Sequence, residues 1–236
     1  AASDVYKRQL IMATGGGAYE LNQDGEIIKI KGINDDCYGL DYIALPNDTS
    51  LYISALYDLF KYHGEEVVSV TQGGPYNARQ SPLNENHLVV LHYDGLQLLE
   101  VNNGRYTELA YVRGFSDGEP FNFVIEDNGD VWIGTKPNDG VYRINVNDLV
   151  AEGPTFKRYY TDEGLPIGQT YLVRHDNDVF CATNFGVYKF TDEQFAATTE
   201  FGVDFSQTGQ GVHRISTDPK GNVSVSFKGK ILRADN

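Results

Sequence analysis

Five side chains able to bind a polar molecule recur at nearly fixed distances before five similar strands of the sequence. They are Tyr42, Arg79, Asn122, Thr170 and His213, each nine residues before its strand, or ten for the last. The segments leading into these positions add Asp36, Tyr38, Tyr76, Asn77, Asp117, Glu119, Gln169 and Gln210. Loops on a rigid scaffold often carry binding groups, so we predict a ligand site from these residues. Ordinary solvated loop residues are the alternative.

Metal, cofactor and nucleophile signatures do not occur. The histidines are His63, His87, His92, His175 and His213. They show neither HExxH nor another close ligand spacing, so no metal site is predicted. Gly15-Gly16-Gly17 lacks the later glycine of GxGxxG and is typical of a turn, and neither GxxxxGK[ST] nor GxSxG is present. We therefore predict no cofactor and no catalytic residue.

Two acidic segments resemble calcium loops only superficially. Asp127-Asn128-Gly129-Asp130 and Asp176-Asn177-Asp178 lack the alternating oxygen ligands and the terminal Glu of an EF-hand loop. Asp and Asn favour turns because their side chains bond the local backbone, so both segments are predicted to be turns. The segment 216–221 approaches a sialidase Asp-box but lacks its aromatic residue and has one residue too many, so it too is predicted to be a turn between strands.

Composition indicates an all-β protein and excludes some partners. The 236 residues are 41% hydrophobic and 12% aromatic and include 25 glycines, which suits many short strands and tight turns. The formal net charge of -14 argues against nucleic acid, whose binding requires clustered Lys and Arg. No apolar run approaches the length of a membrane span, so no direct membrane insertion is expected. Cys37 and Cys181 could be free thiols or a single bridge.

A strand of five residues repeats six times along the chain. Its copies are LIMAT from Leu10, LYISA from Leu51, LVVLH from Leu88, VWIGT from Val131, VFCAT from Val179 and VSVSF from Val223. A repeat of about 42 residues accommodates four short antiparallel strands, and such units stack as the blades of a β-propeller. The clearest unit predicts strands at 121–127, 131–136, 141–146 and 156–161.

The ends of the repeat array are incomplete. The first unit is expected to lack its inner strand and the last to end after its third, which predicts about six blades of a larger ring or an imperfect six-bladed one. Residues 4–9, DVYKRQ, resemble the translated end of a sequencing-library adapter. We therefore expect residues 1–9 to be non-native and residues 10–236 to form a single propeller domain or part of one. A signal peptide would not be visible in such a fragment.

Two stretches, 121–144 and 156–190, resemble two-component regulator propeller repeats. The matching residues are Phe156, Tyr159, Gly164-Leu165-Pro166, Asp127-Asn128-Gly129, Trp132-Ile133-Gly134-Thr135, Gly140-Val141-Tyr142 and Gly186-Val187-Tyr188. Residues 37–110 keep the spacing but not GLP or the tryptophan. In that family the propellers are extracytoplasmic sensor parts of hybrid histidine kinases, many responding to oligosaccharides. The resemblance implies a periplasmic or extracellular location, signal transduction by parts outside this chain, and possible dimerisation of the full receptor.

Three functions are compatible with the sequence. The leading interpretation is a noncatalytic sensor module that binds a small polar ligand such as an oligosaccharide, because aromatic faces beside Asn, Arg and Asp suit a sugar. A propeller hydrolase or lyase acting on a carbohydrate or lactone is the alternative, and it requires clustered carboxylates near Asp36, Asp117 and Glu119. A protein-interaction platform is the third and would expose a broad apolar patch.

Overall fold

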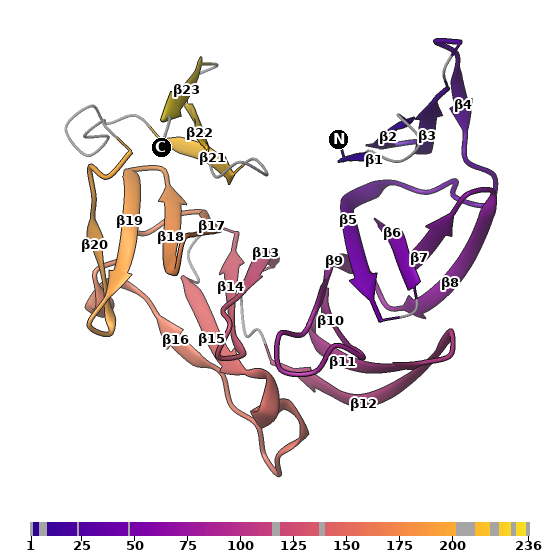
Figure 1. Cartoon of the computed structure of the whole chain (residues 1–236). Helices are drawn as coiled ribbons and strands as arrows, with labels where there is room; N and C mark the ends of the chain where they lie inside the picture. The colour runs from indigo at the N-terminus through magenta and orange to yellow at the C-terminus, as the bar shows by residue number, and fades with distance from the viewer. Residues whose placement is uncertain are drawn as a thin grey trace. The chain divides into compact units, whose positions relative to one another are not determined.

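The structure, a computed structural model, consists almost entirely of antiparallel strands (Figure 1). It describes residues 2–4, 9–22, 24–46, 48–114, 119–136, 140–201, 211–217, 222–227 and 230–234. Within them the only helices are two short 3-10 segments, η1 (Val146–Val150) and η2 (Thr161–Glu163). The chain divides into two compact units, Ala1–Arg113 (unit 1) and Gly114–Asn236 (unit 2). Whether residues 10–236 form a single domain stays a prediction.

Unit 1 contains three four-stranded sheets, each formed by consecutive strands. The first is β1 (Ala2–Asp4), β2 (Gln9–Thr14), β3 (Gly17–Leu21) and β4 (Ile27–Lys29). The second is β5 (Cys37–Leu45), β6 (Asp48–Ala55), β7 (Asp58–His63) and β8 (Glu66–Gln72). The third is β9 (Pro75–Gln80), β10 (His87–His92), β11 (Gly95–Asn102) and β12 (Arg105–Arg113).

Unit 2 repeats this arrangement. Its first sheet is β13 (Pro120–Ile125), β14 (Asp130–Thr135), β15 (Val141–Asn145) and β16 (Lys157–Tyr159). The next is β17 (Thr170–His175), β18 (Asp178–Thr183), β19 (Gly186–Thr191) and β20 (Gln194–Ala197). The last sheet has three strands in the described part of the chain, β21 (Val212–Thr217), β22 (Val223–Phe227) and β23 (Lys230–Ala234).

The six sheets confirm the predicted fold class, an all-β propeller built from antiparallel blades. Each repeated pentapeptide lies in the second strand of a sheet, namely β2, β6, β10, β14, β18 or β22. One expectation was wrong. The first unit was expected to lack an inner strand, but β1 pairs with β2 and places Ala2 opposite Ile11. Three residues suffice for this pairing, and they belong to the segment 1–9 that was expected to be non-native.

Packing between neighbouring sheets explains why the second strands are so apolar. Every residue of β14 is buried, and five of six in β10 are, because both faces of these strands are covered. In unit 2, Trp132 is fully buried and lies 4.4 Å from the Phe190 ring of the following sheet, measured between centroids. Deleting such a side chain typically costs about 3–5 kcal/mol. The apolar repeat therefore serves the stacking of blades.

Candidate functional site

A β-bulge recurs at the same register position in four inner strands. In β5, β9, β13 and β21 the register skips one residue, between the residues that pair with the fourth and fifth residues of the repeated pentapeptide. The four bulged residues are Tyr38, Tyr76, Phe121 and His213. A bulge redirects a side chain out of the regular alternation, and bulges are common beside functional sites. Three of these four side chains carry six-membered aromatic rings, namely Tyr38, Tyr76 and Phe121.

In unit 1 the two bulged tyrosines lie together. The ring centroids of Tyr38 and Tyr76 are 5.5 Å apart, and Tyr38 is 48% exposed. The close approach of β9 depends on Gly39, because a Cβ there would lie 2.7 Å from both Tyr76 O and Asn77 Nδ2. Gly39 therefore lets the two inner strands bring their aromatic rings into contact. We call Tyr38, Tyr76 and Asn77 the tyrosine surface.

A buried carboxylate lies behind the tyrosine surface. Asp41 is only 8% exposed, and its Oδ2 accepts the Ala78 N–H at 3.1 Å and the Asn77 amide at 3.5 Å. Its Oδ1 lies 3.3 Å from Arg79 Nη1. Burial raises the pKa of Asp41, while Arg79, the Ala78 N–H and Asn77 oppose the rise. Asp41 thus ties β5 to β9 and orients Asn77 and Arg79.

Unit 2 presents a row of aromatic and cationic side chains, three from its inner strands and Lys136 from the position directly after β14. The Phe121 and Tyr171 rings meet edge to face, with centroids 5.7 Å apart. Arg214 Cζ lies 5.5 Å from the centre of the Tyr171 ring, and Lys136 Nζ lies 5.9 Å from that of Phe121. Lys136 also forms an ion pair of 2.8 Å with Glu119. Aromatic faces flanked by charged groups can bind a ligand that has both an apolar face and polar substituents.

The five positions that the sequence predicted to be equivalent are not equivalent in register. Tyr42 is opposite Leu51, the first residue of its pentapeptide, whereas Arg79 is opposite the second residue, Val89. Asn122 is opposite the fourth residue, and Thr170 opposite the fifth. The prediction failed because it assumed that the turns between first and second strands have one length. They differ in length, so a fixed distance of nine residues reaches a different register position in each sheet.

Two of these five residues are buried and join neighbouring sheets. Asn122 Nδ2 donates to Leu172 O at 2.7 Å, and Asn122 Oδ1 accepts Leu172 N–H at 3.0 Å. Thr170 Oγ1 accepts Thr135 N–H at 2.8 Å. Gly134 permits this approach, since a Cβ there would lie 2.5 Å from Thr170 O. Asn122 and Thr170 therefore have clear roles in holding β13, β14 and β17 together.

The other predicted site residues are distributed between the two units. Tyr42, Arg79 and Asp36 are exposed in unit 1, and His213 is exposed in unit 2. Glu119 and Gln169 are half-buried in unit 2. Asp117 and Gln210 lie outside the described residues. In unit 1, Asn77 and Arg79 contact Asp41, and the Tyr38 ring lies against that of Tyr76. Whether these residues bind a ligand stays a prediction.

Sequence reasoning missed Phe121, Tyr171 and Arg214, whose contacts form the row in unit 2. The sequence correctly placed Phe121 in an inner strand. It did not reveal the bulge that turns the Phe121 side chain out of the regular alternation of the strand. A usable signal is an aromatic residue directly followed by Gly or Asn at the start of the inner strand. It occurs at Tyr38-Gly39, Tyr76-Asn77 and Phe121-Asn122.

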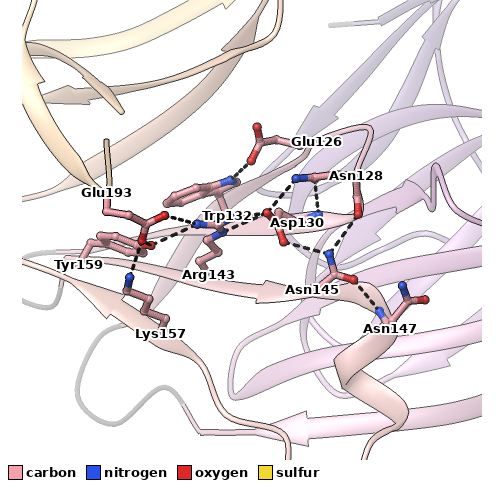
Figure 2. Close-up of polar contacts among 10 residues, drawn as sticks. All are labelled: Glu126, Asn128, Asp130, Trp132, Arg143, Asn145, Asn147, Lys157, Tyr159 and Glu193. Carbon is pink, nitrogen blue, oxygen red and sulfur yellow. Dashed lines mark hydrogen bonds and ion pairs between the residues drawn. The ribbon is translucent and has the colours of Figure 1, made fainter. Parts of the chain in front are cut away.

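The acidic turn at Asp127–Asp130 belongs to a structural network in unit 2 (Figure 2). Asn128 Oδ1 accepts Asp130 N–H at 3.0 Å, which is the local bond expected of a turn. The Asp130 carboxylate accepts hydrogen bonds from Arg143 and Asn145. Arg143 Cζ in turn lies 4.9 Å from the Trp132 ring centre. The predicted turn is confirmed, and its carboxylate is already paired.

Three observations limit the chemistry of the described residues. They contain no group of three or more His, Cys, Asp or Glu side chains arranged to hold a metal ion. Both cysteines in the described ranges are free thiols, with Cys181 buried and Cys37 partly exposed. No helix in the described part of the chain is long and apolar enough to span a membrane.

Comparison with known proteins identifies similar folds but no family. No protein-family model matches the chain, and no curated protein matches it either. Two similar solved structures are extracellular domains assigned to hybrid two component systems of B. thetaiotaomicron. The BT3049 domain has a TM-score of 0.68 and 16% sequence identity, and the match covers 100% of this chain and 33% of that domain. The BT4673 domain has a TM-score of 0.65 and 17% identity, and the match covers 97% of this chain and 31% of that domain. An ancestral GH74 enzyme has a TM-score of 0.65 and 15% sequence identity, and the match covers 95% of this chain and 34% of that enzyme.

These similarities are similarities of fold. The chain spans about a third of the length of each of these three structures. At such identities the shared feature is a stack of antiparallel propeller blades, which both sensor domains and enzymes use. The comparisons therefore place this chain among structures with the propeller fold, including the extracellular sensor domains that the sequence resemblance named.

Proposed function

We propose that this chain is part of an extracytoplasmic sensor propeller that binds a small polar ligand, an oligosaccharide, without chemical conversion. The observation that carries the proposal is the bulge that recurs at one register position and presents Tyr38, Tyr76 and Phe121. The register of the ladder skips these residues, so their side chains contribute little to strand pairing. Aromatic residues at such positions supply flat faces against which a sugar ring can stack.

Polar groups beside the aromatic rings support a carbohydrate as the ligand. Asn77 follows Tyr76 directly, and the buried Asp41 fixes the Asn77 amide and the Arg79 guanidinium. Sugar hydroxyl groups need donors and acceptors in defined positions around an apolar face. The structural similarity to extracellular domains of hybrid two component systems agrees with a sensor role and with a location outside the cytoplasm.

The test is calorimetric titration of the full chain with a panel of neutral and acidic oligosaccharides. We expect one class to bind, and we expect Tyr38→Ala and Tyr76→Ala each to weaken binding about tenfold, the equivalent of roughly 1.4 kcal/mol of lost stacking. Leu109→Ala, at a 40% exposed position on β12 of the same unit, is the matched control and should bind normally. Thermal unfolding of each variant verifies that the fold is intact.

Three outcomes would contradict the proposal. If no oligosaccharide binds, or if both tyrosine variants bind as tightly as the unsubstituted chain, the tyrosine surface is not a sugar site. If chromatography of the incubated mixtures shows cleaved or isomerised products, the chain is a hydrolase or lyase and the noncatalytic role is wrong.

A further inference from the structure

The histidine opposite the Tyr76 bulge is buried between two oxygen acceptors. His92 ends β10, is fully buried, and pairs with Pro75 immediately before the bulged Tyr76. Its Nδ1 lies 3.2 Å from Gly73 O, and its Nε2 lies 2.9 Å from Gln97 Oε1. A neutral imidazole has one N–H, so it can donate to only one of these oxygens. An imidazolium can donate to both.

Neighbouring residues fix which end of the Gln97 amide faces His92. Gln97 Nε2 donates to Glu108 Oε2 at 2.6 Å, and Thr71 Oγ1 donates to Gln97 Oε1 at 3.0 Å. A flipped amide would direct its oxygen at the Glu108 carboxylate, which is repulsive while Glu108 is ionised. The orientation of an amide is assigned from such a network of bonds. The network around His92 therefore matches a doubly protonated ring.

Burial acts against that charged state. Desolvation lowers the pKa of His92, and the contacts with Gln97 and Gly73 and the carboxylates of Asp94 and Glu108 oppose the change. The Tyr111 ring of β12 also faces His92, with the two ring centroids 5.0 Å apart. Tyr111 donates a hydrogen bond to Asp94, which also pairs with Arg113 at 2.9 Å. Desolvation is the largest of these effects, so the net result is a lowered pKa for His92.

Loss of the proton would release the contact with Gly73 first. The Gln97 contact is the shorter, so a neutral ring keeps its single proton on Nε2 and directs a lone pair at Gly73 O. Gly73 N–H donates to Tyr57 O at 3.0 Å, and Tyr93 N–H donates to Gly74 O at 3.0 Å. Gly73 and Gly74 then lead directly into Pro75 and Tyr76. A shift of the Gly73 carbonyl would therefore move the backbone that leads into the bulged Tyr76.

We propose that His92 is a positioning residue for the tyrosine surface, and that protonation of its ring anchors Gly73 and holds Tyr76 in the position seen here. Where that surface binds an oligosaccharide, as proposed above, binding is coupled to proton uptake by His92. The ligand would bind more tightly as pH falls through the range in which His92 titrates. A coupling equivalent to one pKa unit changes the affinity about tenfold.

The first experiment needs no ligand. NMR spectra of the full chain are recorded between pH 5 and 8, following the His92 ring nitrogens and the backbone amides of Gly73 and Tyr76. We expect the two amides to titrate together with His92 and the ring to carry two protons at the acidic end. The proposal is overturned if the ring titrates without moving these amides, or if it stays neutral throughout while the chain remains folded.

A substitution at an exposed residue tests whether His92 positions Gly73 without disturbing the fold. Glu108 is exposed, and Glu108→Gln allows the Gln97 amide to flip and donate to a neutral His92. We expect this variant to remain folded, to lower the titration midpoint of His92 and to weaken its link to Gly73. Glu100→Gln on the adjacent β11 is the matched control and should titrate like the unsubstituted chain. If His92 titrates identically in both variants, Glu108 does not take part in the proposed network.

The coupling to binding is measured by calorimetry in buffers of different ionisation enthalpy. We expect proton uptake on oligosaccharide binding in the unsubstituted chain and in His87→Gln, but not in His92→Gln. Binding without proton uptake in all three would overturn the coupling. If the amides follow His92 in the NMR titration and no oligosaccharide binds at any pH, the positioning role stands and the proposed function fails.

Discussion

The amide group of Asn122 binds both backbone polar groups of Leu172, which belongs to the next inner strand. Nδ2 donates to Leu172 O at 2.7 Å, and Oδ1 accepts Leu172 N–H at 3.0 Å. The side chain therefore extends the hydrogen bonding from one sheet to its neighbour within unit 2. Asparagine suits this position because it carries one donor and one acceptor at its tip.

Removing this amide should destabilise unit 2. In Asn122→Ala two buried backbone groups lose their partners, and we expect the free energy of unfolding to fall by about 2–4 kcal/mol. Chemical denaturation measures this change. Asn102→Ala, at an exposed position at the end of β11, is the control and should stay within about 0.5 kcal/mol of the unsubstituted chain. A loss as small as the control's would mean that water replaces the amide without cost.

Asp41 should make the stability of unit 1 depend on pH. Burial raises its folded-state pKa above the ordinary value, so its favourable contribution is complete below the unfolded pKa and is lost as pH rises through the folded pKa. Asp41→Asn keeps an oxygen for the Ala78 N–H but cannot ionise. We therefore expect the stability of the unsubstituted chain relative to Asp41→Asn to increase as pH falls from 7 towards 4.

Denaturation curves of the two proteins at several pH values measure this difference. Asp41→Ala, which leaves the Ala78 N–H without its acceptor, should be less stable than Asp41→Asn by about 1–3 kcal/mol at pH 7. A difference between the unsubstituted chain and Asp41→Asn that is constant across pH would show that Asp41 titrates normally in the folded protein.

Glu193 should have the opposite pH dependence. It accepts hydrogen bonds from Lys157, from Tyr159 at 2.8 Å and from Arg143 at 3.1 Å (Figure 2). The Lys157 bond, followed by that of Tyr159, lowers the pKa of Glu193 to about 2. Its contribution is therefore present above about pH 4.5 and is lost as pH falls towards 2.

The expected size of the Glu193 effect is small because the side chain is exposed. Glu193→Gln should cost less than about 1 kcal/mol of stability at pH 7, and the difference should shrink in high salt and at low pH. Glutamine preserves the side-chain length, while the backbone stays in its left-handed conformation. Glu152→Gln at an exposed site of unit 2 is the control. Equal costs at low and high salt would contradict the ionic origin of the effect.

The two thiols should differ in reactivity. Burial raises the pKa of both, and Cys181 is fully buried whereas Cys37 is partly exposed. Because the thiolate is the reactive form, we expect iodoacetamide to modify Cys37 slowly in the native protein and Cys181 only after denaturation. Mass spectrometry of tryptic peptides distinguishes the two sites. Modification of Cys181 at the rate of Cys37 would show that the sheet around it opens readily.

The blades could be predicted from the sequence, and the position of the binding surface only in part. The pentapeptides around Trp132 and Val89 are buried on both faces, so their apolar runs repeat and can be recognised. Tyr42, Arg79 and Asn122 were aligned by distance from those runs, but the intervening turns differ in length. A slip by an odd number of residues moves a strand residue to the opposite face, and the three-residue slip between Tyr42 and Asn122 equated an exposed position with a buried one.

The contacts of the polar residues were not visible in sequence. Asp130 pairs with Arg143, thirteen residues later and on the next strand, and Asn122 binds Leu172, fifty residues away. Such pairs depend on how strands and sheets are placed in space, and no local pattern encodes them. The burial of His92 between two acceptors likewise follows from its position at the end of a buried strand beside a bulge.

The bulge also divides the residues of the inner strand into two groups, which differ in how freely they can be replaced. Residues on either side of Tyr38, Tyr76, Phe121 and His213 are held by ladder partners, so their replacement disturbs the blade. The register of the ladder skips the bulged residue itself, so its side chain can change without altering the pairing. Related chains could therefore acquire new ligands by exchanging a single side chain in each blade while the blades stay the same.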